Sequence, residues 1–379
     1  MTLRNFQYSL PTQLIFGENC LSFLQTKIEE NSGTKVAVVM GQGSAREHGV
    51  FDEIASALQL PAEILDGCPQ SPSAEFITDS VYRLKNSGVD FILAVGGGSV
   101  IDASKAIALA LANDTDDIWQ YKSKVVKPLV PALPIGVVLT TTGTGSEVNG
   151  GFVIQNENTS ENFAFSDLTT RPRFACCDPS VTYSLPINVL EDNYTDILSH
   201  LLEQYFSEDE IGYIDQLLVA SIAYLLKERD GFTSLKRNYF DRSNLMLASS
   251  FAMSYLFSMG KHVNWVLHHC AHELSIRENI SHGSSLRRFL PRWLCYLAQN
   301  ERYDQRFQLL ANRMCLKGEE LLEQKKQLIN LITHQSEHSE IDSHVLSKVS
   351  AGISANQSFC ERARLTPADF ECLFSSRKL

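Results

Sequence analysis

Short runs of apolar residues that end in glycine-rich loops recur along the first half of this chain, with amphipathic stretches between them. The apolar runs cover residues 35–40, 90–95 and 133–139. Each run is short, almost wholly apolar and bounded by turn-forming residues, which is typical of a buried strand. Strands that alternate with helices predict a parallel sheet with helices on both faces, which places the first half in the α/β class.

The second half of the chain has a different pattern. Beyond Leu185-Pro186 glycine becomes sparse and helical periodicity dominates, as in residues 217–226 and 244–253. A chain of 379 residues also exceeds the size at which one hydrophobic core usually stops growing. We therefore predict two domains, a Rossmann-like parallel-sheet domain over residues 1–183 and an all-helical domain over residues 184–379.

Two of the loops suit a dinucleotide. The glycines of the segment Gly96-Gly97-Gly98-Ser99 let backbone N–H groups approach a pyrophosphate, and the helix that follows adds partial positive charge. The segment from Thr140 to Ser146 adds hydroxyls at a neighbouring strand end. A lone glycine triplet is often only a tight turn, but two such loops together favour phosphate binding. The expected cofactor-binding residues of the N-terminal domain are Gly41, Gly43, Ser44, Gly97, Gly98, Ser99, Asp102, Thr140, Thr141, Thr144 and Asn149.

The loop after the first apolar run bears on the choice of nucleotide. An acidic residue there would accept a hydrogen bond from a ribose 2′-hydroxyl and repel a 2′-phosphate. The segment Gly41-Gln42-Gly43-Ser44 contains no acid, and Arg46 follows closely. These residues favour NADP(H) over NAD(H), although Arg46 can also simply face solvent.

Four residues of the helical half suit a divalent metal ion. Asp196 and His200 are spaced i, i+4 and lie on one face of a predicted helix, while His268 and His282 lie in a histidine-rich segment. One carboxylate and three imidazoles suit Fe²⁺, Zn²⁺, Ni²⁺ or Co²⁺. A single helical Asp/His pair is usually a surface pair or a cap, so the prediction depends on the whole set. It gives the helical domain a metal-binding role.

Composition narrows the range of partners. The net charge of −11 argues against nucleic acid and against an anionic membrane surface as partners. No apolar run reaches the roughly 18–20 residues of a membrane span, and the N-terminus lacks the basic-then-apolar order of a signal peptide. Nine scattered cysteines without a C-x-x-C pair indicate reduced thiols, so we expect a cytoplasmic protein.

Taken together, these motifs resemble those of the iron-containing alcohol dehydrogenase family, in its branch of butanol dehydrogenases and aldehyde reductases. The resemblance runs from Pro11 to about Trp293, roughly three-quarters of the chain. It is carried by the glycine loop with Asp102, the Thr-Gly-Thr-Gly-Ser-Glu147 segment, Asp196 with His200, the segment from Trp265 to Ser275, and His282-Gly283.

The resemblance implies a function and roles for single residues. It implies an oxidoreductase that transfers a hydride between NAD(P) and a primary alcohol or aldehyde. Asp196, His200, His268 and His282 would bind the metal, and His272 would handle the proton as the catalytic histidine. A small-molecule substrate and a homodimer or larger homo-oligomer are expected.

Two alternatives remain open, and departures from the family pattern motivate the second of them. Asn162 stands where family members often carry a lysine, and the C-terminal third lacks the usual family segment in residues 320–350. One alternative is a metal- and NAD-dependent cyclase or lyase of the dehydroquinate-synthase type, although the basic cluster that a phosphate-bearing substrate needs is not evident. The other is a non-catalytic relative that keeps the fold.

Overall fold

The computed structural model describes residues 4–123, 126–159, 161–207, 209, 212–333 and 341–375. The chain forms two compact units. The sheet unit contains Ser9–Pro186 together with Leu235–Ser254, and the helical unit contains Met1–Tyr8, Ile187–Ser234 and Tyr255–Leu379. The predicted division into residues 1–183 and 184–379 stays a prediction.

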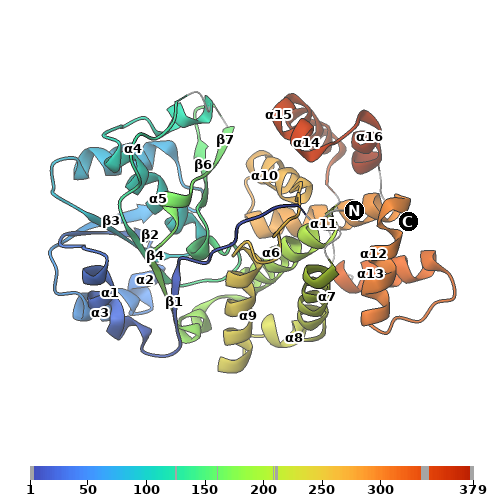
Figure 1. Cartoon of the computed structure of the whole chain (residues 1–379), viewed down its shortest axis with the longest axis horizontal. Helices are drawn as coiled ribbons and strands as arrows, with labels where there is room; N and C mark the ends of the chain where they lie inside the picture. Colours follow the sequence, from blue (N-terminus) through green and yellow to red (C-terminus); the bar gives the residue numbers. More distant parts are fainter. Residues whose placement is uncertain are drawn as a thin grey trace. The chain divides into compact units, whose positions relative to one another are not determined.

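The sheet unit is built on a parallel sheet of six strands in the order β1-β8-β5-β4-β2-β3 (Figure 1). The first half therefore has the predicted α/β architecture. The strands of this sheet are β1 (Gln13–Phe16), β2 (Val36–Gly41), β3 (Ala62–Cys68), β4 (Phe91–Gly96), β5 (Ile135–Leu139) and β8 (Phe174–Cys177).

Successive strand residues fill two separate cores because side chains alternate between the faces of a strand. In β4, Ile92 and Ala94 pack with helices α4 (Ala74–Leu84) and α5 (Gly98–Ala112). Phe91, Leu93 and Val95 of the same strand pack on the other face, with residues of α1 (Leu24–Glu30) and α3 (Val50–Ala57). Burial on both faces explains why the strands read as continuous apolar runs.

The sheet unit also contains a hairpin that the sequence did not predict, and a predicted helix that was assigned to the other domain. The antiparallel hairpin of β6 (Gly151–Asn156) and β7 (Glu161–Ser166) packs on α5 and α4. Helix α9 (Tyr239–Ala252) lies far along the chain, yet its Met246 is part of the core on the α5 side of the sheet. The remaining short elements of this unit are α2 (Ser44–Glu47), η1 (Cys20–Phe23), η2 (Ile118–Ser123), η3 (Ser146–Val148), η4 (Leu168–Thr170) and η5 (Pro179–Ser184).

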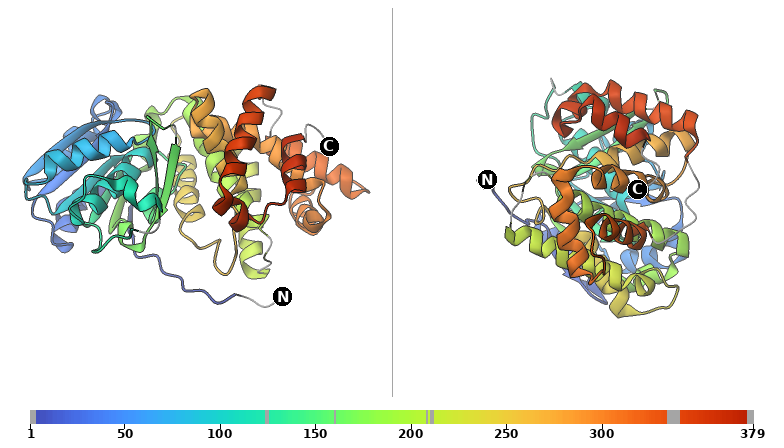
Figure 2. Two further views of the ribbon diagram at one scale, coloured as in Figure 1. Left: turned by 90° about the horizontal axis from the view of Figure 1, so that it is seen from above. Right: turned by 90° about the vertical axis from the view of Figure 1, so that its right-hand side faces the viewer.

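The helical unit shows no strand among its described residues, as expected from its periodicity. Its α6 packs against α7, α10 and α11, and α10 also contacts α11 and α14 (Figure 2). The helices are α6 (Ile187–Tyr205), α7 (Gly212–Lys227), α8 (Arg229–Phe232), α10 (Val266–Glu278), α11 (His282–Ala298), α12 (Asp304–Arg313), α13 (Leu321–Thr333), α14 (Ser343–Ala355), α15 (Gln357–Ala363) and α16 (Pro367–Ser375), with the short η6 (Glu301–Tyr303).

Candidate metal centre and cofactor loops

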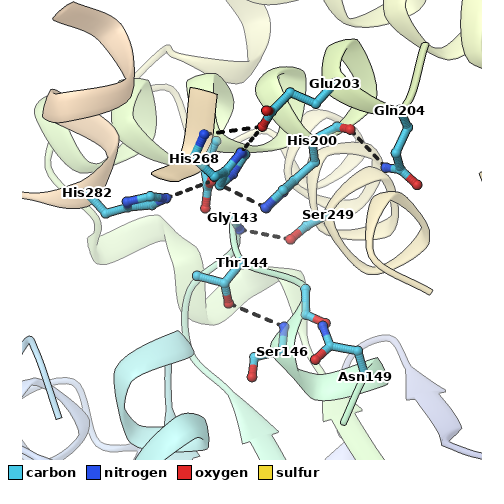
Figure 3. A network of polar contacts seen from close by, with 12 residues as sticks. Gly143, Thr144, Ser146, Asn149, His200, Glu203, Gln204, Ser249, His268 and His282 are labelled. Carbon is cyan, nitrogen blue, oxygen red and sulfur yellow. Dashed lines mark hydrogen bonds and ion pairs between the residues drawn. The ribbon is translucent and has the colours of Figure 1, made fainter. Parts of the chain in front are cut away.

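Three helices of the helical unit bring the four predicted ligands together (Figure 3). Asp196 and His200 lie one turn apart on α6, and both are buried. His268 lies in the first turn of α10, and His282 is the first residue of α11. The Nε2 atoms of His200, His268 and His282 lie 3.5, 3.3 and 3.7 Å from Asp196 Oδ1.

This spacing fits a bound ion. Donors about 2.1 Å from a tetrahedral metal lie about 3.4 Å apart, which matches the 3.3–3.7 Å separations between the carboxylate oxygen and the imidazoles. The donor atoms of Asp196, His268 and His282 also lie within 4.8 Å of one another. One hard oxygen and three borderline nitrogens suit Fe²⁺, Zn²⁺, Co²⁺ or Ni²⁺.

Asp196 and His282 have the protonation states that metal ligands need, whereas the imidazole of His268 has to release a proton when it binds an ion. Burial alone would raise the pKa of Asp196, but the surrounding histidines hold that pKa below its usual range, so the carboxylate stays ionised. Burial lowers the pKa of His282 to about 4, which leaves this imidazole neutral with a free lone pair near neutral pH. Burial would also lower the pKa of His268, but Glu203 and Asp196 raise it to about 9. Two carboxylates beside one imidazole make the cluster attractive to a cation.

Glu203 is a functional candidate that sequence reasoning missed. Its carboxylate accepts a hydrogen bond from His268 Nδ1 and others from the backbone N–H groups of Leu267 and His268, at 2.7 and 3.3 Å. A carboxylate behind a histidine fixes which ring nitrogen carries the proton and turns the other toward the metal. The signal was available, because Glu203 follows Asp196 by seven residues and His200 by three and so falls on the same face of α6.

The local sequence explains how His268 and His282 are presented. Helix α10 starts after Trp265 and ends at Asn279, and both of these residues adopt the left-handed conformation, with φ of 54° and 51°. The left-handed Asn279 terminates α10 sharply, so only a short turn separates α10 from α11. The indole of Trp265 stands edge-on to the ring of His268, with centroids 5.5 Å apart at 89°. The indole therefore lies against one side of the four predicted metal ligands.

The start of α11 is held against α6. Ser281 caps α11 by accepting a hydrogen bond from Ser284 N at 3.1 Å, and its hydroxyl donates to Asp192 Oδ2 at 2.5 Å. A Cβ on Gly283 would lie 2.4 Å from Asp192 Cβ, a distance that real side chains do not reach. Glycine at this position therefore lets α11 approach α6 closely enough to present His282.

His272 lies beside this cluster. It is one turn after His268 on α10, and its ring stacks on that of His282 with centroids 4.4 Å apart. Burial and the neighbouring His282 lower the pKa of His272 well below its usual value. The imidazole is therefore neutral near neutral pH, and one of its ring nitrogens can donate a hydrogen bond while the other accepts one.

The glycine loop and the threonine loop of the sheet unit meet, as expected for loops at the ends of the neighbouring strands β4 and β5. A Cβ on Gly97 would lie 2.2 Å from Thr141 Cγ2, and one on Gly98 would lie 2.5 Å from Thr144 Cγ2. Thr140 N donates to Gly96 O at 3.1 Å. The glycines are therefore required for packing between the loops, in addition to any approach of a phosphate.

Asp102 and Asn149 hold the loops together from within the unit. Asp102 accepts hydrogen bonds from Ser146 Oγ at 2.6 Å and Val153 N at 2.8 Å. Asn149 donates to Gly145 O at 2.9 Å, as part of the network in the lower half of Figure 3. Both side chains are hydrogen-bonded to the protein, and their predicted contact with a cofactor stays a prediction.

Lys105 is a buried cation in the same network. Its Nζ donates to Ser146 Oγ and to Gly151 O, both at 2.6 Å. Burial lowers the pKa of Lys105 to about 8, although the nearby carboxylates of Asp102 and Glu147 raise it. Lys105 thus links α5, which follows the glycine loop, to the start of the β6–β7 hairpin.

The first loop follows β2 at the same edge of the sheet. Gly41 is the last residue of β2, Gly43 has φ of 140°, and Ser44 begins α2. The next cation, Arg46, donates to Asp66 Oδ2 through Nη2 at 2.5 Å and Nε at 3.1 Å. Asp66 of β3 therefore lies near the first loop, although the loop itself contains no acidic residue.

Two family models match this chain. Iron-containing alcohol dehydrogenase matches residues 11–179, and the C-terminal model of the Fe-containing alcohol dehydrogenase family matches residues 193–348. NADH-dependent butanol dehydrogenase B of Clostridium acetobutylicum is 33% identical, over 78% of this chain and 76% of that protein. NADPH-dependent aldehyde reductase YqhD of Escherichia coli is 34% identical, over 76% of this chain and 75% of that protein.

A solved structure extends the likeness beyond the matched sequence. NADH-dependent butanol dehydrogenase A of Thermotoga maritima superposes with a TM-score of 0.88 at 26% identity, and the match covers 98% of both chains. The family model ends at residue 348, whereas this match covers almost the whole chain, so the described residues beyond 348 also share the fold of that structure.

The chain belongs to the iron-containing alcohol dehydrogenase family. The predicted fold class and the predicted enzyme class, a metal-dependent alcohol dehydrogenase or aldehyde reductase, are confirmed. The family also implies a nicotinamide cofactor and a divalent metal. No helix among the described residues is long and apolar enough to cross a membrane.

Proposed function

We propose that the protein transfers a hydride between a nicotinamide cofactor and a primary alcohol or aldehyde, with a divalent ion held by Asp196, His200, His268 and His282. The observation that carries this proposal is the convergence of three imidazole Nε2 atoms on one oxygen of Asp196. An ion bound there supplies Lewis acidity to the substrate oxygen.

The protein groups around the ion have separate tasks in this proposal. Glu203 keeps the proton of His268 on Nδ1 and so turns Nε2 inward. His272 exchanges the hydroxyl proton of the substrate in this proposal, because its ring stacks on that of His282 and so lies next to the proposed ligands without being one of them.

The loops of the sheet unit hold the dinucleotide. The proposed contacts are Gly41, Gly43 and Ser44 in the first loop, Gly97, Gly98 and Ser99 in the glycine loop, and Thr140, Thr141 and Thr144 in the threonine loop, with Asp102 and Asn149 bracing them. NADP(H) is preferred over NAD(H), because the first loop carries no acid that would repel a 2′-phosphate. Comparison of kcat/KM for NADPH and NADH with one aldehyde tests this preference.

Two broader properties complete the proposal. The chain works in the cytoplasm, which is consistent with nine free cysteines. It assembles as a homodimer or larger homo-oligomer, and light scattering coupled to size-exclusion chromatography measures the mass that decides this.

Replacement of one ligand tests the metal site. His268→Ala should lose both bound metal and turnover of NADPH with an aldehyde, because a missing donor removes much of the affinity. His48→Ala is the matched control, since His48 is exposed in the sheet unit. Full metal content with wild-type turnover in His268→Ala would remove His268 from the site. A metal-replete wild type without turnover would favour a non-catalytic relative.

A further inference from the structure

Arg46 and Asp66 form an ion pair at the edge of the sheet where the first loop lies. Both hydrogen bonds from Arg46 reach the same carboxylate oxygen, Asp66 Oδ2. The guanidinium also lies 4.0 Å above the centre of the Phe51 ring, which fixes its plane. The two side chains are each 45% exposed, so a ligand in solvent can reach them.

The strand register explains why the pair stands beside the first loop. Strands β2 and β3 are parallel neighbours, and Gly41 pairs with Cys68 at their carboxyl ends. Asp66 precedes Cys68 by two residues and points to solvent, whereas the alternate residue Leu65 is buried. Arg46 follows the same loop on α2. The loop thus lies next to one anionic and one cationic group, although its own residues carry no charge.

An acidic and a basic side chain beside this loop favour different nucleotides. At the carboxyl ends of such strands, an acid accepts a hydrogen bond from a ribose 2′-hydroxyl, whereas an arginine accommodates a 2′-phosphate. An arginine bonds phosphate through two parallel N–H groups, as it does a carboxylate. A 2′-phosphate and Asp66 therefore compete for the same guanidinium.

We propose that Asp66 limits the preference of this protein for NADP(H) over NAD(H), because it holds Arg46 and repels a 2′-phosphate. The proposal rests on the dinucleotide function proposed for the sheet unit. Exposed ion pairs of this kind are weak because both groups stay hydrated, so a phosphate can replace the carboxylate. Asp66 weakens binding of the phosphorylated cofactor without abolishing it. The pair is a specificity determinant for the 2′ position of an adenine nucleotide.

Binding of two nucleotide fragments to the full-length protein tests the proposal. Calorimetry should measure the Kd of adenosine 2′,5′-bisphosphate and of adenosine 5′-monophosphate, which differ only in the 2′-phosphate. Asp66→Asn should tighten binding of the bisphosphate about tenfold and leave the monophosphate within about twofold. Arg46→Gln should weaken the bisphosphate by a similar factor. In the Arg46→Gln background, Asp66→Asn should have a clearly smaller effect than in the wild type.

Glu63→Gln is the matched control. Glu63 lies on the same strand as Asp66 and pairs with Lys35 at 3.0 Å, but near the amino end of β3. Glu63→Gln changes the net charge by the same amount as Asp66→Asn, but it should leave the Kd values of both nucleotide fragments unchanged. An equal gain in Glu63→Gln would show that only net charge matters and would overturn the proposal.

The remaining outcomes distinguish a failure of the role of Asp66 from a failure of the proposed dinucleotide function. If the wild type binds both fragments but Asp66→Asn leaves their ratio unchanged, or weakens the bisphosphate, the role of Asp66 is refuted while the dinucleotide function stands. If the wild type binds neither fragment at millimolar concentration, while ligand-observed NMR confirms that they are free in solution, both the role of Asp66 and the dinucleotide function are refuted.

Discussion

Replacement of Glu203 by glutamine should loosen the metal site without a change in any proposed ligand. Oε1 of Glu203 accepts from Leu267 N, and Oε2 accepts from both His268 N and His268 Nδ1. Both carboxylate oxygens are therefore acceptors. An amide has only one acceptor oxygen, so Glu203→Gln cannot reproduce this arrangement in either orientation.

The two orientations of the amide have different costs. If the NH₂ group faces His268, it donates to Nδ1, the ring proton moves to Nε2, and Nε2 can no longer bind a metal. If the NH₂ group faces Leu267 N, two donors meet and a buried hydrogen bond is lost. Loss of such a supporting partner typically costs 10- to 100-fold in metal affinity, or about 1.4–2.7 kcal/mol.

Titration with Co²⁺ measures this effect directly. The apoprotein is titrated in the presence of a chromophoric chelator, and the visible absorption of bound Co²⁺ reports the ligand set. Glu203→Gln should raise the Kd 10- to 100-fold, while Glu273→Gln should not, because Glu273 on α10 pairs with Arg277 instead. A Kd within twofold of wild type, with an unchanged spectrum, would refute the role of Glu203.

Three further perturbations test other parts of the structure. Gly283→Ala should weaken Co²⁺ binding about tenfold or more, since the new Cβ would lie 2.4 Å from a side-chain carbon of α6; an unchanged Kd would contradict this. Lys105→Met should cost about 3–5 kcal/mol in urea unfolding by leaving the buried Asp102 without its cation, and Asp102→Asn in the same chain should restore part of the loss; a loss below 1 kcal/mol would contradict this. Burial raises the pKa of Asp90, but hydrogen bonds from residues 34–35 outweigh it and lower that pKa, so the stability that Asp90 contributes is present above its unfolded pKa of about 3.9 and is lost as the pH falls through the lower folded pKa. The difference in urea midpoint between wild type and Asp90→Asn should therefore shrink between pH 5 and pH 2.5, and a constant difference would contradict the assignment.

The parallel sheet was predictable because strands that are buried on both faces are continuous apolar runs in the sequence. A strand such as residues 91–96 is apolar at every position, and glycines mark its end. The β6–β7 hairpin has a weaker sequence pattern, because its residues alternate in burial and the elements on which it packs are distant in sequence. Helix α9 shows the same limit, since nothing in residues 239–252 indicates that they pack with the sheet.

The predicted metal ligands were identifiable for a different reason. Aspartate and histidine are uncommon in a buried helical face, so their presence at i, i+4 spacing in α6 stands out. Glu203 lies on the same helix but is a common residue type, and its partner comes from α10. Its function depends on which helix packs on α6, and helix packing is not encoded in local periodicity.

The glycines of the predicted cofactor loops have a packing role that the sequence did not indicate. The sequence placed glycines where a phosphate could approach, and the structure adds that Gly97 and Gly98 are constrained by the threonines of the neighbouring loop. Since a Cβ at either glycine would collide with that loop, a substitution there displaces the second loop as well as narrowing the first. Loss of nucleotide binding in such a variant would therefore not by itself prove contact with phosphate. The Arg46–Asp66 pair is the cleaner probe, because both side chains are 45% exposed to solvent.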